Sequence, residues 1–115
     1  MIKDMIRIAA DHYGITPRLL LENNRRRAYS KAKWAIYVAL RNRNRNYSEI
    51  GRWMKRDHAT IIYGVKQAEY WLERDPDFRD LVQRLTDYRF DPVPEDFVRS
   101  LMRKKEREDG YLVMD

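Results

Sequence analysis

The sequence has no cysteine among its 115 residues. Disulfide bridges, thiolate metal sites and cysteine nucleophiles are therefore excluded, and a cytoplasmic protein is expected. Glycine and proline are scarce, with four residues of each. No apolar run is long enough for a secretory signal or a membrane span, so no membrane partner is expected. These absences, with a charged fraction of 37%, favour a single soluble helical domain over a sheet-rich or low-complexity chain.

The sequence also lacks the motifs on which many enzymes depend. It has no glycine-rich phosphate loop and no dinucleotide-binding fingerprint, so neither a nucleotide nor another cofactor is expected. Its two histidines, His12 and His58, lie far apart, and no serine has the glycine neighbours of a hydrolase nucleophile. Asp57 and His58 are adjacent, which on a helix would point them about 100° apart and disfavours a metal site. We therefore expect no enzyme, no catalytic residue and no bound metal.

Positive charge is concentrated in the middle of the chain. Between Arg25 and Arg56 lie eleven lysines and arginines and one acid, Glu49, so this window carries a formal charge of +10 while the whole chain carries +6. Packing like charges together costs stability, and such a window favours a surface that binds a polyanion such as nucleic acid. The alternative is a charged face that only meets solvent.

Apolar residues recur at three- and four-residue steps through most of the chain, which is typical of amphipathic helices. An all-α fold, a compact helical bundle, is therefore expected. Thr16 before Pro17 and Asp75 before Pro76 are typical helix starts, and Gly14 is a typical helix end. Further helices are expected at about residues 30–43, 48–54, 57–74 and 95–108.

The large apolar side chains of these helices are interpreted as packing residues. His12 is interpreted as a surface residue at the end of the first helix. The expected packing residues are Trp34, Tyr37, Trp53, Ile61, Val65, Trp71 and Phe78.

A short helix, a tight turn and a longer helix over residues 48–74 form the layout of a helix-turn-helix. Ser48 is expected to cap the short helix, and Lys55 and Arg56 to form the turn. In this motif the first residues of the second helix reach base edges in the major groove.

The residues that begin the second helix suit two roles. Asp57 can cap the helix by accepting a hydrogen bond from the amide of Ala59 or Thr60, and this role needs no DNA. Asp57 can also accept from a cytosine amino group, His58 and Thr60 can donate to bases or phosphates, and Ala59 suits a thymine methyl group. The residues that continue the same surface are Tyr63, Lys66 and Gln67.

The stretch SEIGRWMKRDHATIIYGVKQ, residues 48–67, resembles the signature of the C-terminal DNA-binding domain of the bacterial replication initiator DnaA. The order E-I-G, a short spacer and R-D-H carries this resemblance. Upstream, IAADHYGITPRLLLENNRRR is similar to the family's first helices and basic loop, and KAKWAIYVALR to its next helix. The likeness covers about residues 2–85 and implies a helix-turn-helix bundle of the TrpR/DnaA domain IV type.

The resemblance implies contacts with double-stranded DNA. One arginine of Arg25–Arg27 would enter the minor groove, and Lys31 and Lys33 would contact phosphates. Asp57 and His58 would read bases in the major groove. The residues expected to contact DNA are Arg25, Arg26, Arg27, Lys31, Lys33, Ser48, Lys55, Arg56, Asp57, His58, Ala59, Thr60, Tyr63 and Lys66.

Three positions depart from the family pattern. Ala59 stands where the family usually has a hydroxyl residue, Tyr63 where it has a histidine, and Trp34 where it has a glutamine. The resemblance therefore implies DNA binding but leaves the recognised DNA sequence open.

We expect a DnaA-like domain over residues 1–88 and a linker, an amphipathic helix and a tail over residues 89–115. The expected function is sequence-specific binding of double-stranded DNA, as a stand-alone regulator of replication initiation or transcription. A phage or prophage origin would fit such a unit. The alternative is a helical interaction module whose basic face binds an acidic protein, or whose last helix, with Phe97 and Leu101, docks on a partner or a second copy. That helix could also pack on its own core.

Overall fold

The structure, a computed structural model, describes residues 1–22 and 26–89. Within these ranges the chain forms five α-helices and one 3-10 helix and no strand, which confirms the all-α fold. The helix expected at residues 95–108 lies outside the described residues. The elements are α1 (Ile2–Tyr13), η1 (Pro17–Leu21), α2 (Arg27–Asn42), α3 (Tyr47–Met54), α4 (His58–Arg74) and α5 (Pro76–Asp87).

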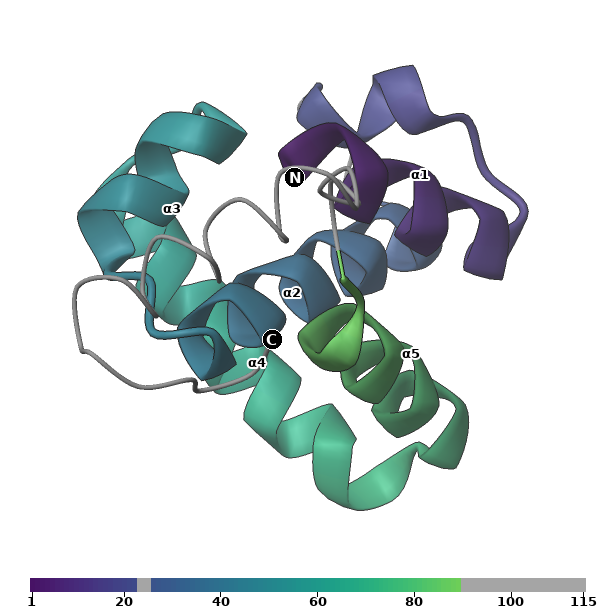
Figure 1. Ribbon diagram of the computed structural model, residues 1–115. Coiled ribbons are helices and arrows are strands. Elements are labelled where there is room, and N and C mark those ends of the chain that lie inside the picture. The colour runs from purple at the N-terminus through teal and green to yellow at the C-terminus, as the bar shows by residue number, and fades with distance from the viewer. Residues whose placement is uncertain (23–25, 90–115) are drawn as a thin grey trace, which may run out of the picture.

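Helix α2 runs through the middle of the bundle, with the other α-helices around it (Figure 1). Six consecutive residues of α2, from Ala35 to Leu40, are buried. A helix that is buried on all sides must pack neighbours on every face, and α2 contacts α1, α3, α4 and α5. Its three buried alanines, Ala32, Ala35 and Ala39, let these helices approach closely.

Several helix ends lie where the sequence predicts them. Gly14 ends α1 in the left-handed conformation, with φ 65°, which glycine adopts at low cost. Pro17 begins η1 after Thr16. The side chain of Asp75 accepts a hydrogen bond from the amide of Phe78 at 3.2 Å and so caps α5.

Two predicted helix starts are wrong. Helix α2 begins at Arg27, three residues before the expected start, because Arg27 and Ala28 are good helix formers. Helix α3 is capped by Asn46 and not by Ser48. The Asn46 side chain accepts from the amide of Glu49 at 2.8 Å, and the Glu49 carboxylate accepts from the amide of Asn46 at 3.1 Å. Asparagine is as strong a cap as serine, and this reciprocal pair satisfies two amides at once.

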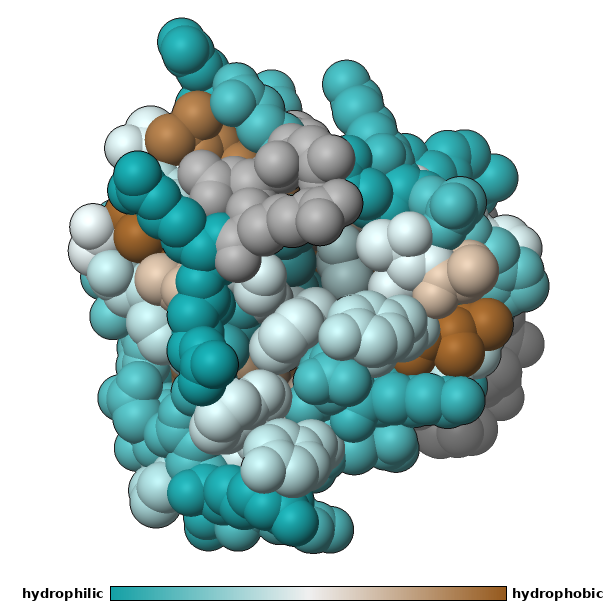
Figure 2. Space-filling model, turned by 180° about the vertical axis from the view of Figure 1, so that it is seen from behind, coloured by the Kyte–Doolittle hydropathy of each residue, from teal (hydrophilic) through white to brown (hydrophobic). Residues whose placement is uncertain are grey.

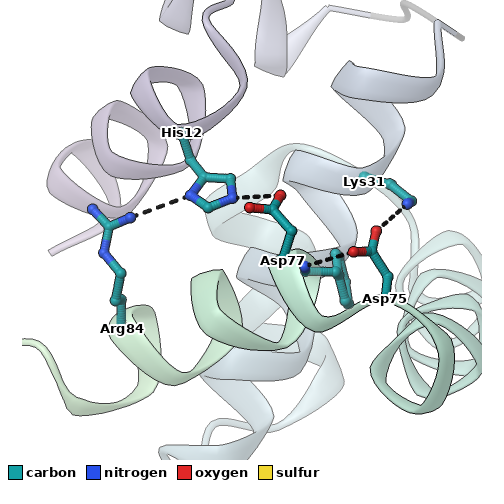
Figure 3. Close-up of polar contacts among 6 residues, drawn as sticks. His12, Lys31, Asp75, Asp77 and Arg84 are labelled. Atoms are coloured by element: carbon teal, nitrogen blue, oxygen red, sulfur yellow. Dashed lines mark hydrogen bonds and ion pairs between the residues drawn. The ribbon is translucent and has the colours of Figure 1, made fainter.

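His12 lies in the last turn of α1, as expected, but its interpretation as a surface residue is wrong. Its side chain is only 11% exposed, and its Nε2 atom lies 2.8 Å from a carboxylate oxygen of Asp77 (Figure 3). A guanidinium nitrogen of Arg84 lies 3.2 Å from its Nδ1 atom. A guanidinium can only donate, so this geometry assigns the ring proton to Nε2. His12 therefore ties α1 to α5.

The packing residues divide into two groups. Tyr37, Ile61, Val65 and Phe78 are buried in the core, as expected. The three tryptophans, Trp34, Trp53 and Trp71, are partly buried and pack against the core from its edge.

Candidate nucleic-acid interface

Helices α3 and α4 form a helix-turn-helix because the chain turns tightly at Lys55 and Arg56. Lys55 adopts the left-handed conformation, with φ 56°, and the amide of Arg56 donates to the carbonyl of Gly51 at 2.9 Å. A Cβ atom at Gly51 would lie 2.7 Å from the carbonyl oxygen of Arg56. Only glycine lets the turn come this close to α3. This explains the glycine of the E-I-G stretch in physical terms.

The N-terminus of α4 is capped and exposed. The Asp57 carboxylate accepts a hydrogen bond from the amide of Thr60 at 2.7 Å, as the sequence predicts. The hydrogen bonds with Thr60 lower the pKa of the Asp57 carboxyl, so it stays ionised at neutral pH and can act only as an acceptor. His58, Ala59 and Thr60 are all exposed. The cap and a possible base contact thus occupy the same short segment.

The first half of α4 presents one polar face to solvent. Ile61, Gly64 and Val65 turn inward, whereas Tyr63 is 58% exposed and Lys66 is exposed. The outward residues recur at helical spacing, so they form one strip along α4. A helix fits into the major groove of DNA and can present such a strip to base edges.

Helix α2 brings a second cation to this region. The pKa of Lys33 is lowered by partial burial and, to a smaller extent, by the positive charge of Arg56. Burial raises the pKa of Tyr37 to about 12, while the nearby Arg56 acts in the opposite direction. Two like charges held close together are destabilising in isolation and are favourable when a polyanion binds. Lys33 and Arg56, predicted as separate contacts, are thus near enough for their charges to interact.

The remaining residues predicted to contact DNA lie on several elements. Arg26 and Arg27 are exposed at the N-terminus of α2, and Lys55 is exposed in the turn. Arg25 lies outside the described residues. Ser48 is exposed on α3 and does not cap this helix, because Asn46 is the cap.

Lys31 has a different environment. Its ammonium lies 2.6 Å from the Asp75 carboxylate and 3.7 Å from the ring centroid of Trp71, and its side chain is 11% exposed. Figure 3 shows Lys31 directed to the start of α5. This geometry makes Lys31 a link between α2 and the α4–α5 junction, so the structure does not favour the predicted phosphate contact.

A groove of about 410 Å³ lies between α2 and α4, and the sequence does not predict it. The rings of Trp34 and Tyr63 meet edge to face at 6.5 Å beside it. Gly64 allows this approach, because a Cβ atom there would lie within 2.9 Å of the Tyr37 and Trp34 rings. A glycine inside a helix costs about 1 kcal/mol and is the one sequence signal of this contact. The groove is lined by Arg27, Ser30, Trp34, Gln67 and Trp71.

Sequence reasoning also missed an aromatic and cationic cluster at the start of α3. The rings of Tyr47 and His58 lie 5.7 Å apart, and the guanidinium of Arg41 lies 4.4 Å from the Tyr47 ring centroid. Beside them the guanidinium of Arg45 lies 5.6 Å from the ring centroid of Trp53. The arginine-rich loop and its flanking aromatics are visible in the sequence, but the pairing depends on how α3 and α4 pack.

One face of the molecule is mostly polar (Figure 2), and the described residues contain neither a metal-binding cluster nor a membrane-spanning helix. The face shown in Figure 2 is dominated by hydrophilic side chains, with only small apolar patches. Within residues 1–22 and 26–89, no cluster of three or more histidine, aspartate or glutamate side chains is arranged to hold a metal ion. No helix in this part of the chain has the length and apolar character that a membrane crossing needs.

The fold defines a helix-turn-helix domain whose second helix begins with a capped, exposed segment directly after Lys55 and Arg56, and domains of this class generally bind DNA. Residues 2–68 match the family described as "Bacterial dnaA protein helix-turn-helix", and the chain belongs to this family.

Several similar proteins are named as chromosomal replication initiators. The chain is 36% identical over 76 residues to the "Chromosomal replication initiator protein DnaA" of Agrobacterium fabrum. The aligned residues make up 64% of this chain and 16% of that protein. It is 31% identical over 86 residues to the protein of the same name from Wolbachia pipientis, and the alignment covers 73% of this chain and 19% of that protein. The Deinococcus radiodurans protein of that name is 30% identical over 83 residues, covering 71% and 18%. The chain thus spans less than a fifth of the length of these relatives.

Proposed function

We propose that this chain binds double-stranded DNA in a sequence-specific manner, with the first half of α4 in the major groove. One observation carries the proposal. The exposed start of α4, from Asp57 to Thr60, directly follows Arg56, whose charge also acts on Lys33 of α2. Base-reading groups and phosphate-binding groups thus share one surface.

The proposed roles follow from the chemistry of each side chain. Asp57 is an ionised acceptor and suits the amino group of cytosine, while His58 and Thr60 can donate to bases or phosphates. Arg56 and Lys33 bind phosphates and hold the helix in register without reading sequence. Arg25, Arg26, Arg27, Ser48, Lys55, Ala59, Tyr63 and Lys66 complete the proposed surface.

Selection from a random duplex library at about 0.15 M salt, followed by titration of the enriched duplex against scrambled DNA, tests the proposal. We expect an enriched motif with at least about a thousand-fold preference over scrambled duplex. Weak, salt-sensitive binding without enrichment would contradict the proposal and leave Asp57 as a helix cap only.

Variants at the start of α4 assign the base contacts. We expect His58→Ala and Asp57→Ser to lower discrimination at one base pair each, by about 5- to 100-fold per lost contact. Serine still caps a helix, so Asp57→Ser separates base reading from capping. Lys3→Ala, which removes an exposed cation of α1, is the control and should leave discrimination unchanged.

A narrower proposal is that this chain controls replication initiation or transcription as a unit of its own. The relatives named as replication initiators support the first process. Mapping the chain's binding sites in cells tests it: sites at a replication origin support replication control, and sites at promoters alone support transcription. The alternative, a protein-interaction module whose basic face binds an acidic partner, stays a prediction, and the helix expected at residues 95–108 lies outside the described residues.

A further inference from the structure

The first residues of the two helices of the motif are in contact. Tyr47 begins α3 and His58 begins α4, and their ring centroids lie 5.7 Å apart with the planes inclined by 43°. Aromatic rings at this separation attract each other beyond the area they bury. Neither spacing nor motif pairs these two residues, which lie on different helices.

Tyr47 is itself firmly held. It is half-buried and packs against the core, and it directly follows the capping asparagine of α3. The guanidinium of Arg41 lies 4.4 Å from its ring centroid, and Arg41 is anchored in turn by a 3.0 Å hydrogen bond from its guanidinium to the carbonyl of Arg45. Tyr47 therefore offers a fixed surface, whereas His58 is exposed to solvent.

We infer that Tyr47 is a positioning residue for base readout, whose ring holds the imidazole of His58 in the orientation that the recognition helix presents to a base edge. This inference rests on the proposed function. A side chain ordered before binding loses less conformational freedom when the complex forms. The orientation of an imidazole also decides which ring nitrogen meets the base. Tyr47 thus acts on specificity without touching DNA itself.

The alternative is that Tyr47 only packs against the core. Replacement of Tyr47 by leucine and by phenylalanine distinguishes the two roles. Both side chains fill apolar space, but only phenylalanine keeps a ring face for His58 and Arg41. A packing role predicts that Tyr47→Leu and Tyr47→Phe behave alike. A positioning role predicts that only Tyr47→Leu changes base discrimination.

The experiment measures the affinity of the full chain for its preferred duplex and for duplexes altered at each base pair. The variants are Tyr47→Leu, Tyr47→Phe, His58→Ala and the double variant Tyr47→Leu/His58→Ala. We expect Tyr47→Leu to lower discrimination roughly 3- to 10-fold at the one base pair where His58→Ala has its effect. Tyr47→Phe should match the unmodified chain. In the His58→Ala background, Tyr47→Leu should have no further effect at that base pair.

Two controls accompany these measurements. Tyr70 is an exposed tyrosine farther along α4 whose ring also carries an arginine, Arg74, at 3.8 Å from its centroid, and Tyr70→Leu should leave discrimination unchanged. Proton NMR of the free chain reports the ring contact directly. The ring-proton shifts of His58 should move in Tyr47→Leu and stay close to their original values in Tyr47→Phe.

Two results would overturn the inference. If His58→Ala removes discrimination at one base pair and Tyr47→Leu leaves it intact, Tyr47 only packs, and the proposed function stands. If His58→Ala alters no base preference, His58 is not a base reader. The inference then falls together with that part of the proposed function, while enrichment of a motif would still support sequence-specific binding.

Discussion

Among single residues, the two helical glycines at the motif have the clearest structural reasons. Gly51 allows the turn to approach α3, and Gly64 allows α4 to approach the rings of Tyr37 and Trp34. At both positions a neighbouring group occupies the space that a Cβ atom would need. Glycine is therefore required here for steric reasons and not for backbone flexibility. Alanine at either position has to displace a neighbour, although alanine is the better helix former.

We expect Gly64→Ala to lower the free energy of unfolding by about 1 kcal/mol. Overpacking costs about 1–3 kcal/mol and outweighs the gain of about 1 kcal/mol in helix propensity. Urea denaturation measures the change. Glu69→Ala, at an exposed position of the same helix, is the control and should stay within about 0.5 kcal/mol of the unmodified chain. A Gly64→Ala variant more stable than the original would show that the rings can move aside.

At the scale of elements, helix caps set the boundaries of the motif. The structure assigns the cap of α3 to Asn46, whereas the sequence pattern favours Ser48. We expect Asn46→Ala to lower the free energy of unfolding by about 1 kcal/mol, because the amide of Glu49 loses its partner. Ser48→Ala should change it by less than about 0.5 kcal/mol. Chemical denaturation of the two variants compares them, and a larger loss in Ser48→Ala would contradict the capping box.

The junction between α4 and α5 depends on an ionised carboxylate. The hydrogen bond from Lys31 is the largest cause that lowers the pKa of Asp75, and the amide of Phe78 adds to it. A carboxyl whose pKa is lower in the folded chain stabilises the fold above its unfolded pKa of about 3.9. That stabilisation is lost as the pH falls through the lowered folded pKa.

We therefore expect Asp75→Asn to lower the free energy of unfolding at neutral pH by about 1 kcal/mol and to weaken its decline in acid. Asparagine can still cap α5, so the change reports the charge of Asp75 and its pairing with Lys31. Denaturation curves between about pH 2 and pH 7 measure both effects. Asp80→Asn, at an exposed position of α5, is the control, and the same acid dependence in both variants would argue against a special role for Asp75.

At the scale of the whole molecule, the basic window becomes one surface only through folding. Lys33 lies on α2, Arg26 directly precedes α2, and Arg56 lies in the turn before α4, yet the charge of Arg56 acts on Lys33. Charges gathered from separate segments of the chain onto one face attract a polyanion over a longer range than the same charges scattered over the surface.

We expect the double variant Arg26→Ala/Lys33→Ala to weaken binding to every duplex by a similar factor. The slope of log affinity against log salt should fall by about 2, since each phosphate contact contributes about 0.9. Titrations of specific and scrambled duplex at several salt concentrations measure both quantities. Lys3→Ala should leave the slope unchanged. A loss confined to the specific duplex would mean that these cations read sequence.

The local features of this protein could be predicted from its sequence. Gly14, the Asp57 cap and the Asp75 start of α5 lie where the pattern indicates them. They depend on interactions within four residues along the chain, which spacing and residue type express directly. The order of E-I-G and R-D-H likewise predicts the motif, because its turn is also local.

Only the tertiary structure decided which distant residues meet. His12 pairs with Asp77 across 65 residues, and Lys31 turns to Asp75 across 44 residues instead of to the proposed DNA-binding surface. The contact between Tyr47 and His58 joins two helices in the same way. Such contacts depend on the angle and distance at which whole helices pack, and these are decided by the shapes of many core side chains together. The sequence by itself thus determined the helices, the helix-turn-helix motif and the positive sign of the surface charge. The packing of the helices decided which side chains lie together in the candidate site.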